Sequence, residues 1–293
     1  MIDGEPSRPA WSAALHRAAH QIVDGGAVFP DAVAVPITCW SPERVADDAR
    51  LHPQRRGMRA FIACRHRYAR DVLARSAADA QVVVLGAGLD TIAYQPLGLL
   101  GGTVFEVDHP ATQSWKLERL VEAGISPTVP VRYVAVDFET DDLTAALEAA
   151  GFDRERPVAV VWLGVTVYLT ADAIEETVAR VAGLSSARTD LVLDYSEHDP
   201  GTGAGARRRT ARANRVASIG EPWLTHFTPS ELASLFERHG FDEVEDLGFA
   251  GWGTRYLGLP PETPDRPSGH LVHAVRHGSG ALYCSAPDAT MPP

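Results

Sequence analysis

Cysteine, long apolar runs and basic charge are all scarce in this chain of 293 residues. The three cysteines, Cys39, Cys64 and Cys284, are too few and too scattered for a disulfide framework or a zinc site. No apolar run approaches the roughly twenty residues that span a membrane, and the first residues lack the basic and then apolar pattern of a signal peptide. We therefore expect core thiols and a cytoplasmic protein.

The balance of charge also bears on the partners of the chain. It has 27 Lys and Arg residues against 38 Asp and Glu residues, and this net charge of −11 opposes binding to nucleic-acid phosphates or anionic membranes. With 45% hydrophobic residues, the composition suits a large domain with a buried core. The expected partner is a small-molecule substrate, not nucleic acid or a membrane, and the sequence leaves open whether the chain forms an oligomer.

Several catalytic signatures are missing as well. His16 and His20 have a helical spacing but lack the glutamate of the zinc-protease pattern, so no metal is expected. The chain has no nucleophile elbow, no phosphate loop with a Lys and a Ser or Thr, and no paired-carboxylate signature. The sequence therefore gives no support for these classes of chemistry.

One stretch organises the rest of the chain. The apolar run 82–85 is typical of a strand buried on both faces, and Gly86 and Gly88 after it allow a sharp turn close to a ligand. A dinucleotide-binding motif has a third glycine at the position of Thr91. Asp90 puts a carboxylate where a pyrophosphate would lie, but it would suit a cofactor with an ammonium group and no phosphate. The turn therefore favours S-adenosylmethionine over NAD.

The next predicted strand ends in an acidic residue. Asp108 follows the glycine turn by about twenty residues, the spacing at which a carboxylate accepts hydrogen bonds from ribose hydroxyls. We therefore predict that Asp108 binds the ribose of the cofactor. A Gly-x-Gly turn is a weak signal by itself, and the acidic partner makes the pattern much more specific.

Strand and helix signals alternate after the glycine turn. Five β-α steps in series predict an α/β fold with a doubly wound parallel sheet, in which ligands bind outside the carboxyl ends of the strands. Two more strands follow in the last quarter of the chain. Strands are expected at 82–85, 103–108, 131–136, 157–164, 191–195, 244–247 and 270–275, with helices at 110–121, 143–150, 171–184 and 229–236.

Helical segments also precede the glycine turn. Apolar residues at helical spacing predict helices at 11–22 and 58–73, and the prolines between them predict an irregular connection. In the second half of the chain, the glycine-rich linker 201–205 and the arginines after it predict a mobile lid. The predicted division is a helical cap at 1–78, a cofactor domain at 79–277 with a lid insertion at about 198–220, and a flexible tail at 278–293.

Three motifs lie at predicted strand ends. They are Val84-Leu85-Gly86-Ala87-Gly88-Leu89-Asp90-Thr91, then Phe105-Glu106-Val107-Asp108-His109-Pro110 with Lys116, and Trp162-Leu163-Gly164-Val165 with Tyr168-Leu169. Together they resemble the leucine carboxyl methyltransferase family, and more closely its bacterial branch of O-methyltransferases assigned to secondary metabolism. The resemblance covers about 17–275. It implies the class I methyltransferase fold, a Rossmann-like sheet of seven strands with the last one antiparallel.

The resemblance also implies a ligand for each part of S-adenosylmethionine. Arg65, on the second predicted helix, should bind the methionine carboxylate, and Gly86 and Gly88 should pass beside it. Asp108 should hold the ribose. The other implied contacts are Ala87, His109 and, at the adenine, Asp137 and Phe138.

One position departs from the family pattern. Carboxyl methyltransferases of this family have a glutamate before the glycine at the end of the fourth strand, where this chain has Leu163 before Gly164. A leucine side chain cannot accept a hydrogen bond from the cofactor ammonium, so the backbone carbonyls of Leu163 and Gly164, helped by Asp90, are expected to do so. The protein substrate of those enzymes is therefore not carried over.

Methyl transfer depends little on acid or base catalysis. It is an in-line displacement that depends on alignment and on a desolvated nucleophile, so catalytic residues are expected to be few. For a hydroxyl acceptor a base would help, and Tyr168, Tyr195 and His198 are the candidates because they lie at predicted strand ends.

A carboxylate acceptor would need a cation in place of a base. It is already ionised at neutral pH, and Arg255 or an arginine of the lid would orient it. The stretch 220–227 resembles a family segment that lines the acceptor pocket, so Glu221 and Trp223 are predicted to contact the substrate.

The leading hypothesis is an S-adenosylmethionine-dependent O-methyltransferase that acts on a hydroxyl or carboxylate of a small molecule, such as a specialised metabolite. One alternative is an enzyme of the same fold that uses the cofactor in a non-methylating step such as a cyclisation. Another is a cofactor-binding regulatory module without turnover. Formation of S-adenosylhomocysteine separates the first hypothesis from the other two.

Overall fold

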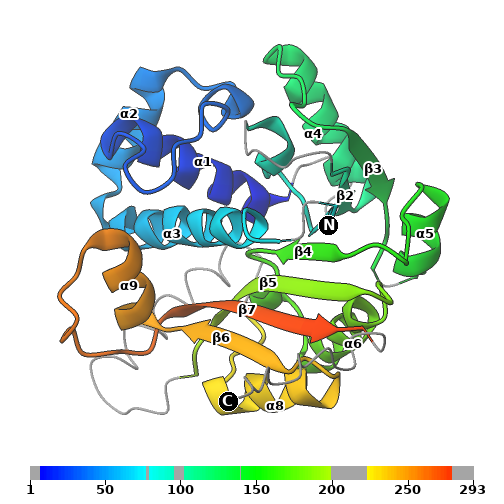
Figure 1. The fold of residues 1–293 in the computed structure, drawn as a ribbon. Coiled ribbons are helices and arrows are strands. Elements are labelled where there is room, and N and C mark those ends of the chain that lie inside the picture. The colour runs from blue at the N-terminus through cyan, green and yellow to red at the C-terminus, as the bar shows by residue number, and fades with distance from the viewer. Residues whose placement is uncertain (1–6, 77–78, 96–101, 139, 199–222, 279–293) are drawn as a thin grey trace, which may run out of the picture.

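The computed structural model describes residues 7–76, 79–95, 102–138, 140–198 and 223–278. These residues form one seven-stranded sheet with helices on both faces (Figure 1). The predicted lid after His198, the predicted contact residue Glu221 and the tail after residue 278 lie outside the described residues. No helix within the described ranges is long and apolar enough to cross a bilayer.

The strands follow the predicted order along the chain. They are β1 (Gln81–Leu85), β2 (Val104–Asp108), β3 (Val131–Ala135), β4 (Val158–Trp162), β5 (Arg188–Ser196), β6 (Glu243–Leu247) and β7 (Gly269–His277). In the sheet they lie in the order β3-β2-β1-β4-β5-β7-β6. Only β7 is antiparallel to its two neighbours, β5 and β6, among these seven strands. The predicted α/β, class I methyltransferase architecture is therefore confirmed.

The central strands β1 and β4 are buried on both faces, as their unbroken apolar sequences predict. They pair in parallel, with Val82 opposite Ala159 and Val83 opposite Val160. From β1 the chain continues outward to β2, whereas from β4 it continues to β5 on the other side. Sheets of this type usually bind ligands at the carboxyl ends of the two strands where the direction changes, which are β1 and β4 here.

Two layers of helices bury the faces of the sheet. Leu143 and Ile174 pack with one core cluster, whereas Tyr68 and Trp252 pack with the other. The first layer contains α5 (Leu143–Ala149), α6 (Ala171–Ala182) and α8 (Pro229–Arg238), and the second contains α3 (Arg56–Leu73), α4 (Pro110–Glu122) and α9 (Phe249–Leu257). Short 3-10 helices are η1 (Pro36–Thr38), η2 (Pro53–Arg55), η3 (Ile92–Tyr94) and η4 (Thr166–Tyr168).

The N-terminal helices α1 (Arg8–Val23) and α2 (Pro42–Leu51) pack outside α3 (Figure 1). Helix α2 lies where the prolines predict an irregular connection, so that prediction is wrong for this stretch. Pro42 occupies the first turn of the helix, where its missing N–H has no partner to lose, and the Ser41 hydroxyl accepts from the Arg44 N–H. The proline therefore starts a helix here.

Candidate cofactor site

The glycine turn after β1 fits closely between two segments. Gly86 has φ of +63°, and a Cβ there would lie 2.7 Å from Cγ2 of Val165 in the loop after β4. A Cβ on Gly88 would lie 2.9 Å from Cβ of Ala10, at the start of α1. Both glycines are therefore required by a positive φ and by close neighbours, and the turn lies beside the first helix of the cap.

Asp108 holds this turn from the neighbouring strand. Its Oδ2 accepts a hydrogen bond of 2.5 Å from the Gly88 N–H, and its Oδ1 accepts one of 2.7 Å from the His109 N–H. Burial raises the pKa of Asp108 above its ordinary value, although both backbone hydrogen bonds favour the ionised form. Each oxygen keeps acceptor capacity for a further donor, so the carboxylate can receive ribose hydroxyls as predicted.

Arg65 reaches the end of β4 from helix α3. Its side chain is 9% exposed, and Nη1 donates to Oδ2 of Asp194 over 3.1 Å. Gly164 makes room for the guanidinium, because a Cβ at this glycine would lie 2.7 Å from Nη2. Nε of Arg65 is buried and has no hydrogen-bond partner among the described residues. The guanidinium therefore keeps a donor for a ligand, which fits the methionine carboxylate that the sequence assigns to it.

Asp194 joins three elements at this edge of the sheet. Its Oδ1 accepts from the Gly164 N–H over 2.6 Å, and its backbone carbonyl accepts from the Thr166 hydroxyl over 2.7 Å. The sequence analysis did not single out this residue. The available signal was its position as an acidic residue near the end of an apolar strand, the same signal that identifies Asp108.

Asp90 is buried beside a polar network that lies between the glycine turn and the cap. Its Oδ1 accepts from the Ile92 N–H over 2.7 Å, and its Oδ2 lies 3.5 Å from Nε2 of His66. Nδ1 of His66 lies 2.7 Å from the Ile62 carbonyl oxygen, so it carries the proton. Burial lowers the pKa of His66, which keeps the ring neutral and leaves Nε2 as an acceptor.

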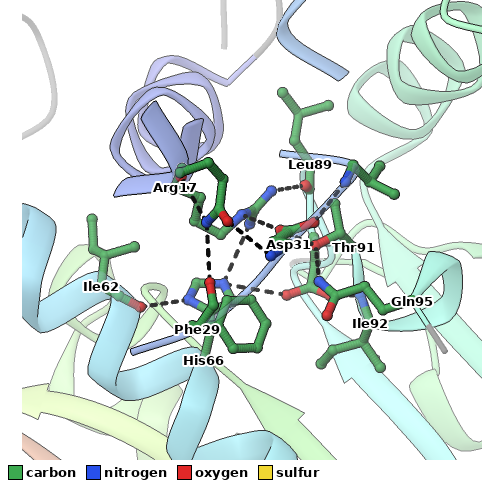
Figure 2. Close-up of polar contacts among 12 residues, drawn as sticks. Arg17, Phe29, Asp31, Ile62, His66, Leu89, Thr91, Ile92 and Gln95 are labelled. Atoms are coloured by element: carbon green, nitrogen blue, oxygen red, sulfur yellow. Dashed lines mark hydrogen bonds and ion pairs between the residues drawn. The ribbon is translucent and has the colours of Figure 1, made fainter. Parts of the chain in front are cut away.

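Arg17 on α1 completes the network. Its Nη1 lies 3.3 Å from Nε2 of His66, its Nη2 donates to the Leu89 carbonyl oxygen, and its Nε lies 3.5 Å from Oδ2 of Asp31 (Figure 2). Asp31 also accepts from the Thr91 hydroxyl over 2.7 Å. Nε2 of His66 is an acceptor and cannot donate to Asp90, so Oδ2 of Asp90 keeps acceptor capacity, and the role of Asp90 at the cofactor ammonium stays a prediction. The carboxylate beside Gly164 is that of Asp194.

The remaining predicted cofactor residues lie around the same edge. Ala87 is buried and its N–H donates to the Val107 carbonyl oxygen over 3.0 Å. Nδ1 of His109 accepts from the Ala111 N–H at the start of α4. Phe138, after β3, is 36% exposed, which leaves its ring accessible to an adenine. The roles of Ala87, His109, Asp137 and Phe138 stay predictions.

Of the three candidate bases, Tyr195 is poorly suited. Its hydroxyl donates to Oδ2 of Asp246 over 2.8 Å and lies 3.0 Å from Nδ1 of His270. Burial and the Asp246 charge raise the pKa of Tyr195, so the phenol stays protonated at neutral pH. Tyr168 is half-buried in η4, and His198 is exposed at the end of the described segment after β5.

The segment that begins at Trp223 lies against the loop after β4. The Leu224 N–H donates to the Val167 carbonyl oxygen over 2.7 Å, and the Thr225 hydroxyl donates to the Leu169 carbonyl oxygen over 2.5 Å. The segment borders a cavity of about 500 Å³ that Ala171 of α6 and Leu235 of α8 also line. These bonds place the segment 223–227 along residues 167–169 after β4, and the substrate contact of Trp223 stays a prediction.

Arg255 lies elsewhere. It is on α9, a helix that the sequence analysis did not predict, and its Nη2 forms an ion pair of 2.6 Å with Oε1 of Glu245 in β6. The Tyr68 hydroxyl donates to the same carboxylate over 2.8 Å. These contacts occupy Arg255 at the edge of the sheet, so the structure does not bring it together with Arg65 and Gly164.

A family model described as leucine carboxyl methyltransferase matches residues 10–182. A relative from Mycolicibacterium smegmatis, named as an S-adenosyl-L-methionine-dependent methyltransferase, is 33% identical over 218 residues, which cover 67% of this chain and 72% of that protein. A relative from Mycobacterium avium with the same kind of name is 33% identical over 222 residues, which cover 75% of this chain and 61% of that protein.

A solved structure from Thermobifida fusca, described as that of a methyltransferase, has a TM-score of 0.55 and 19% identity, and it covers 95% of this chain and 97% of that one. This likeness supports the class I methyltransferase fold. The family description and the names of the relatives confirm the predicted resemblance, and with it S-adenosylmethionine as the cofactor.

Proposed function

Since the chain belongs to the leucine carboxyl methyltransferase family and is an S-adenosylmethionine-dependent methyltransferase, we propose that it methylates an oxygen of a small molecule. The observation that carries the proposal is the pairing of two anchors at one edge of the sheet. Arg65 lies against Gly164 after β4, and its Nε has no hydrogen-bond partner in the part of the chain that the structure describes. Asp108 holds the glycine turn after β1. These anchors suit the two polar ends of the cofactor.

Each anchor has a distinct task in this proposal. Arg65 binds the methionine carboxylate through its remaining donors, and Asp108 accepts the ribose hydroxyls. Gly86 lets the turn after β1 pass close to Val165, because a Cβ would lie 2.7 Å from Cγ2 of that residue, and the proposed cofactor lies beside this turn. When bound, S-adenosylmethionine supplies an electrophilic methyl group on its sulfonium.

The proposed acceptor is a hydroxyl or a carboxylate, and the two groups need different side chains in the site. A carboxylate needs only orientation and exclusion of water, because it is ionised at neutral pH. A hydroxyl gains from a base, and Tyr168 is the better placed candidate, since it lies beside the Trp223 segment whereas Tyr195 is held by Asp246.

The proposed substrate is a specialised metabolite, and the proposed location is the cytoplasm. The net charge of −11 supports a small molecule over nucleic acid or an anionic surface.

Two measurements test the proposal. Calorimetric titration should give dissociation constants in the micromolar range for S-adenosylmethionine and S-adenosylhomocysteine, with no competition by NAD. Incubation with S-adenosylmethionine and a panel of phenols and carboxylic acids should then give S-adenosylhomocysteine in an acceptor-dependent amount. Equal affinity for NAD would contradict the cofactor site. Conversion of the acceptor without methylation and without formation of S-adenosylhomocysteine would favour a cyclisation instead, and binding without any conversion would favour a regulatory module.

A further inference from the structure

We propose that Asp194 receives the α-ammonium group of S-adenosylmethionine, so that Arg65 and Asp194 together recognise the zwitterion of its methionine part. This inference rests on the proposed function and adds a cofactor-binding residue to that site. It names the buried ion pair on α3 and β5 as the selective element for an α-amino acid group.

The Arg65–Asp194 ion pair leaves hydrogen-bond donors and acceptors unused, and these suit an α-amino acid group. Arg65 and Asp194 have side chains that are 9% and 7% exposed, and one Nη1–Oδ2 contact of 3.1 Å joins them. Nε of Arg65 has no hydrogen-bond partner within the described ranges. Asp194 uses one oxygen for Arg65 and the other for the Gly164 N–H, and each oxygen keeps a second lone pair.

A buried ion pair is stabilising only when its remaining donors and acceptors are satisfied, because desolvation of both charges opposes its formation. An α-amino acid group carries the complementary pair of charges. Its carboxylate can receive the free donors of Arg65, while its ammonium donates to Asp194. Ligand binding would therefore complete the hydrogen bonding of both side chains.

Two other carboxylates lie near the glycine turn, and neither forms an ion pair with Arg65 among the described residues. Asp90 accepts from the Ile92 N–H and faces His66. Asp108 accepts from the N–H groups of Gly88 and His109 and lies at the predicted ribose end. Asp194 is beside Gly164 and Arg65, where the carboxylate of the amino acid group is expected, so an ammonium two bonds away from that carboxylate falls within its reach.

Asp190 provides a matched control on the same strand. It is also buried, lies four residues before Asp194 on the same face of β5, and pairs with Arg188 and His273. Asp194→Asn and Asp190→Asn each remove one buried carboxylate charge with almost no change in shape. Only the first should affect the amino acid end of the cofactor.

The experiment is a calorimetric titration of the wild type and both variants with three ligands: S-adenosylhomocysteine, its deaminated analogue, and 5′-methylthioadenosine, which lacks the amino acid part. Asp194→Asn should weaken binding of S-adenosylhomocysteine by about tenfold or more, as expected for a lost charge-assisted hydrogen bond. Its affinities for the other two ligands should match those of the wild type. Asp190→Asn should bind all three ligands like the wild type.

An equal loss for all three ligands would show a purely structural role and overturn the inference, as would unchanged binding of S-adenosylhomocysteine. If Asp194→Asn does not fold, the wild type alone decides: it should bind the deaminated analogue at least about tenfold more weakly than S-adenosylhomocysteine. Comparable affinities there would contradict an ammonium–Asp194 contact. Failure of the wild type to bind S-adenosylhomocysteine would instead contradict the proposed function itself.

Discussion

The two ends of β5 carry the same type of buried acid with different surroundings. At the amino end, Asp190 accepts two hydrogen bonds from Arg188, of 2.8 and 2.9 Å, and lies 2.8 Å from Nε2 of His273. At the carboxyl end, Asp194 accepts from Arg65 over 3.1 Å and from the Gly164 N–H over 2.6 Å. Both acids face the α3 side of the sheet.

The two ion pairs differ in the hydrogen-bond donors that Arg188 and Arg65 do not use for the paired carboxylate. Arg188 is 36% exposed, so water can satisfy the donors that Asp190 does not use. Arg65 is enclosed beneath the cap, and its Nε has no hydrogen-bond partner among the described residues. The Asp190–Arg188 pair, whose donors are satisfied by Asp190 and water, stabilises the fold. The Asp194–Arg65 pair is enclosed at the carboxyl edge of the sheet and keeps a donor without a partner among the described residues, so it is suited to a ligand.

The largest expected effect comes from replacing Arg65, the cationic member of the Arg65–Asp194 ion pair. Arg65→Met should lower the affinity for S-adenosylhomocysteine by about 3 kcal/mol, roughly a hundredfold, because it removes the carboxylate partner and leaves Asp194 buried without its cation. Calorimetry checks this, with 5′-methylthioadenosine as the control ligand. A similar loss for that ligand would place the effect on the fold.

Asp108 should give a slightly smaller effect with a different ligand profile. Asp108→Ala should weaken cofactor binding by about 2 kcal/mol, because it removes the ribose acceptor and leaves the Gly88 N–H without its partner. Asp108→Asn should lose less, since its carbonyl can still accept. The loss should extend to 5′-methylthioadenosine, in contrast to Arg65→Met. Selective loss for S-adenosylhomocysteine would show that Asp108 is not at the ribose.

Replacement of Asp190, at the amino end of β5, should change the stability of the fold and not the binding of the cofactor. Burial opposes ionisation of Asp190, but the hydrogen bonds and charges of Arg188 and His273 outweigh it and lower its pKa to about 2. An acid with a lowered folded-state pKa stabilises the fold above its unfolded pKa of about 4, and this contribution is lost as the pH falls through 2.

Asp190→Asn should therefore lower the free energy of unfolding by about 2 kcal/mol at pH 7, and by less as the pH falls below 4. Urea denaturation at several pH values measures this difference. A stability loss that stays constant from pH 7 to pH 3 would show that the ion pair is not its source.

The smallest expected effect comes from crowding Arg65. Gly164→Ala adds a Cβ 2.7 Å from Nη2 of Arg65 at φ of +73°, whereas Gly124→Ala meets nothing within 4 Å at φ of +64°. Both should lose about 1 kcal/mol of stability from backbone strain. Only Gly164→Ala should also weaken S-adenosylhomocysteine binding, by about fivefold. Equal binding by both variants would show that the contact between Gly164 and Arg65 has no role in the site.

Local patterns predict the fold, which is confirmed, and they propose Asp108 as a residue of the site. The apolar run before Gly86, the acid at Asp108 and the alternation of strands and helices depend on short stretches of sequence, and the sheet confirms the predicted order. The prolines around α2 predict an irregular connection because proline interrupts helices, but proline also starts helices, as Pro42 does here. The local feature that identifies the start of the helix is Pro42 directly after the capping residue Ser41.

The rest of the proposed site depends on contacts between distant residues. Arg65 and Asp194 are separated by 129 positions, and no spacing rule connects a helix before the first strand with the end of the fifth. The approach of His66 to Asp90 has the same origin, since His66 lies on α3, before the first strand. Only the packing of α3 across the sheet brings these charges together.

A crystal structure of the complex with S-adenosylhomocysteine tests the central claim most directly. The account predicts the α-amino nitrogen within about 3.2 Å of an Asp194 carboxylate oxygen, with the ligand carboxylate on Arg65 and the ribose hydroxyls on Asp108. A ligand whose amino group contacts only backbone carbonyls, with Asp194 still bound solely to Arg65 and Gly164, would contradict it.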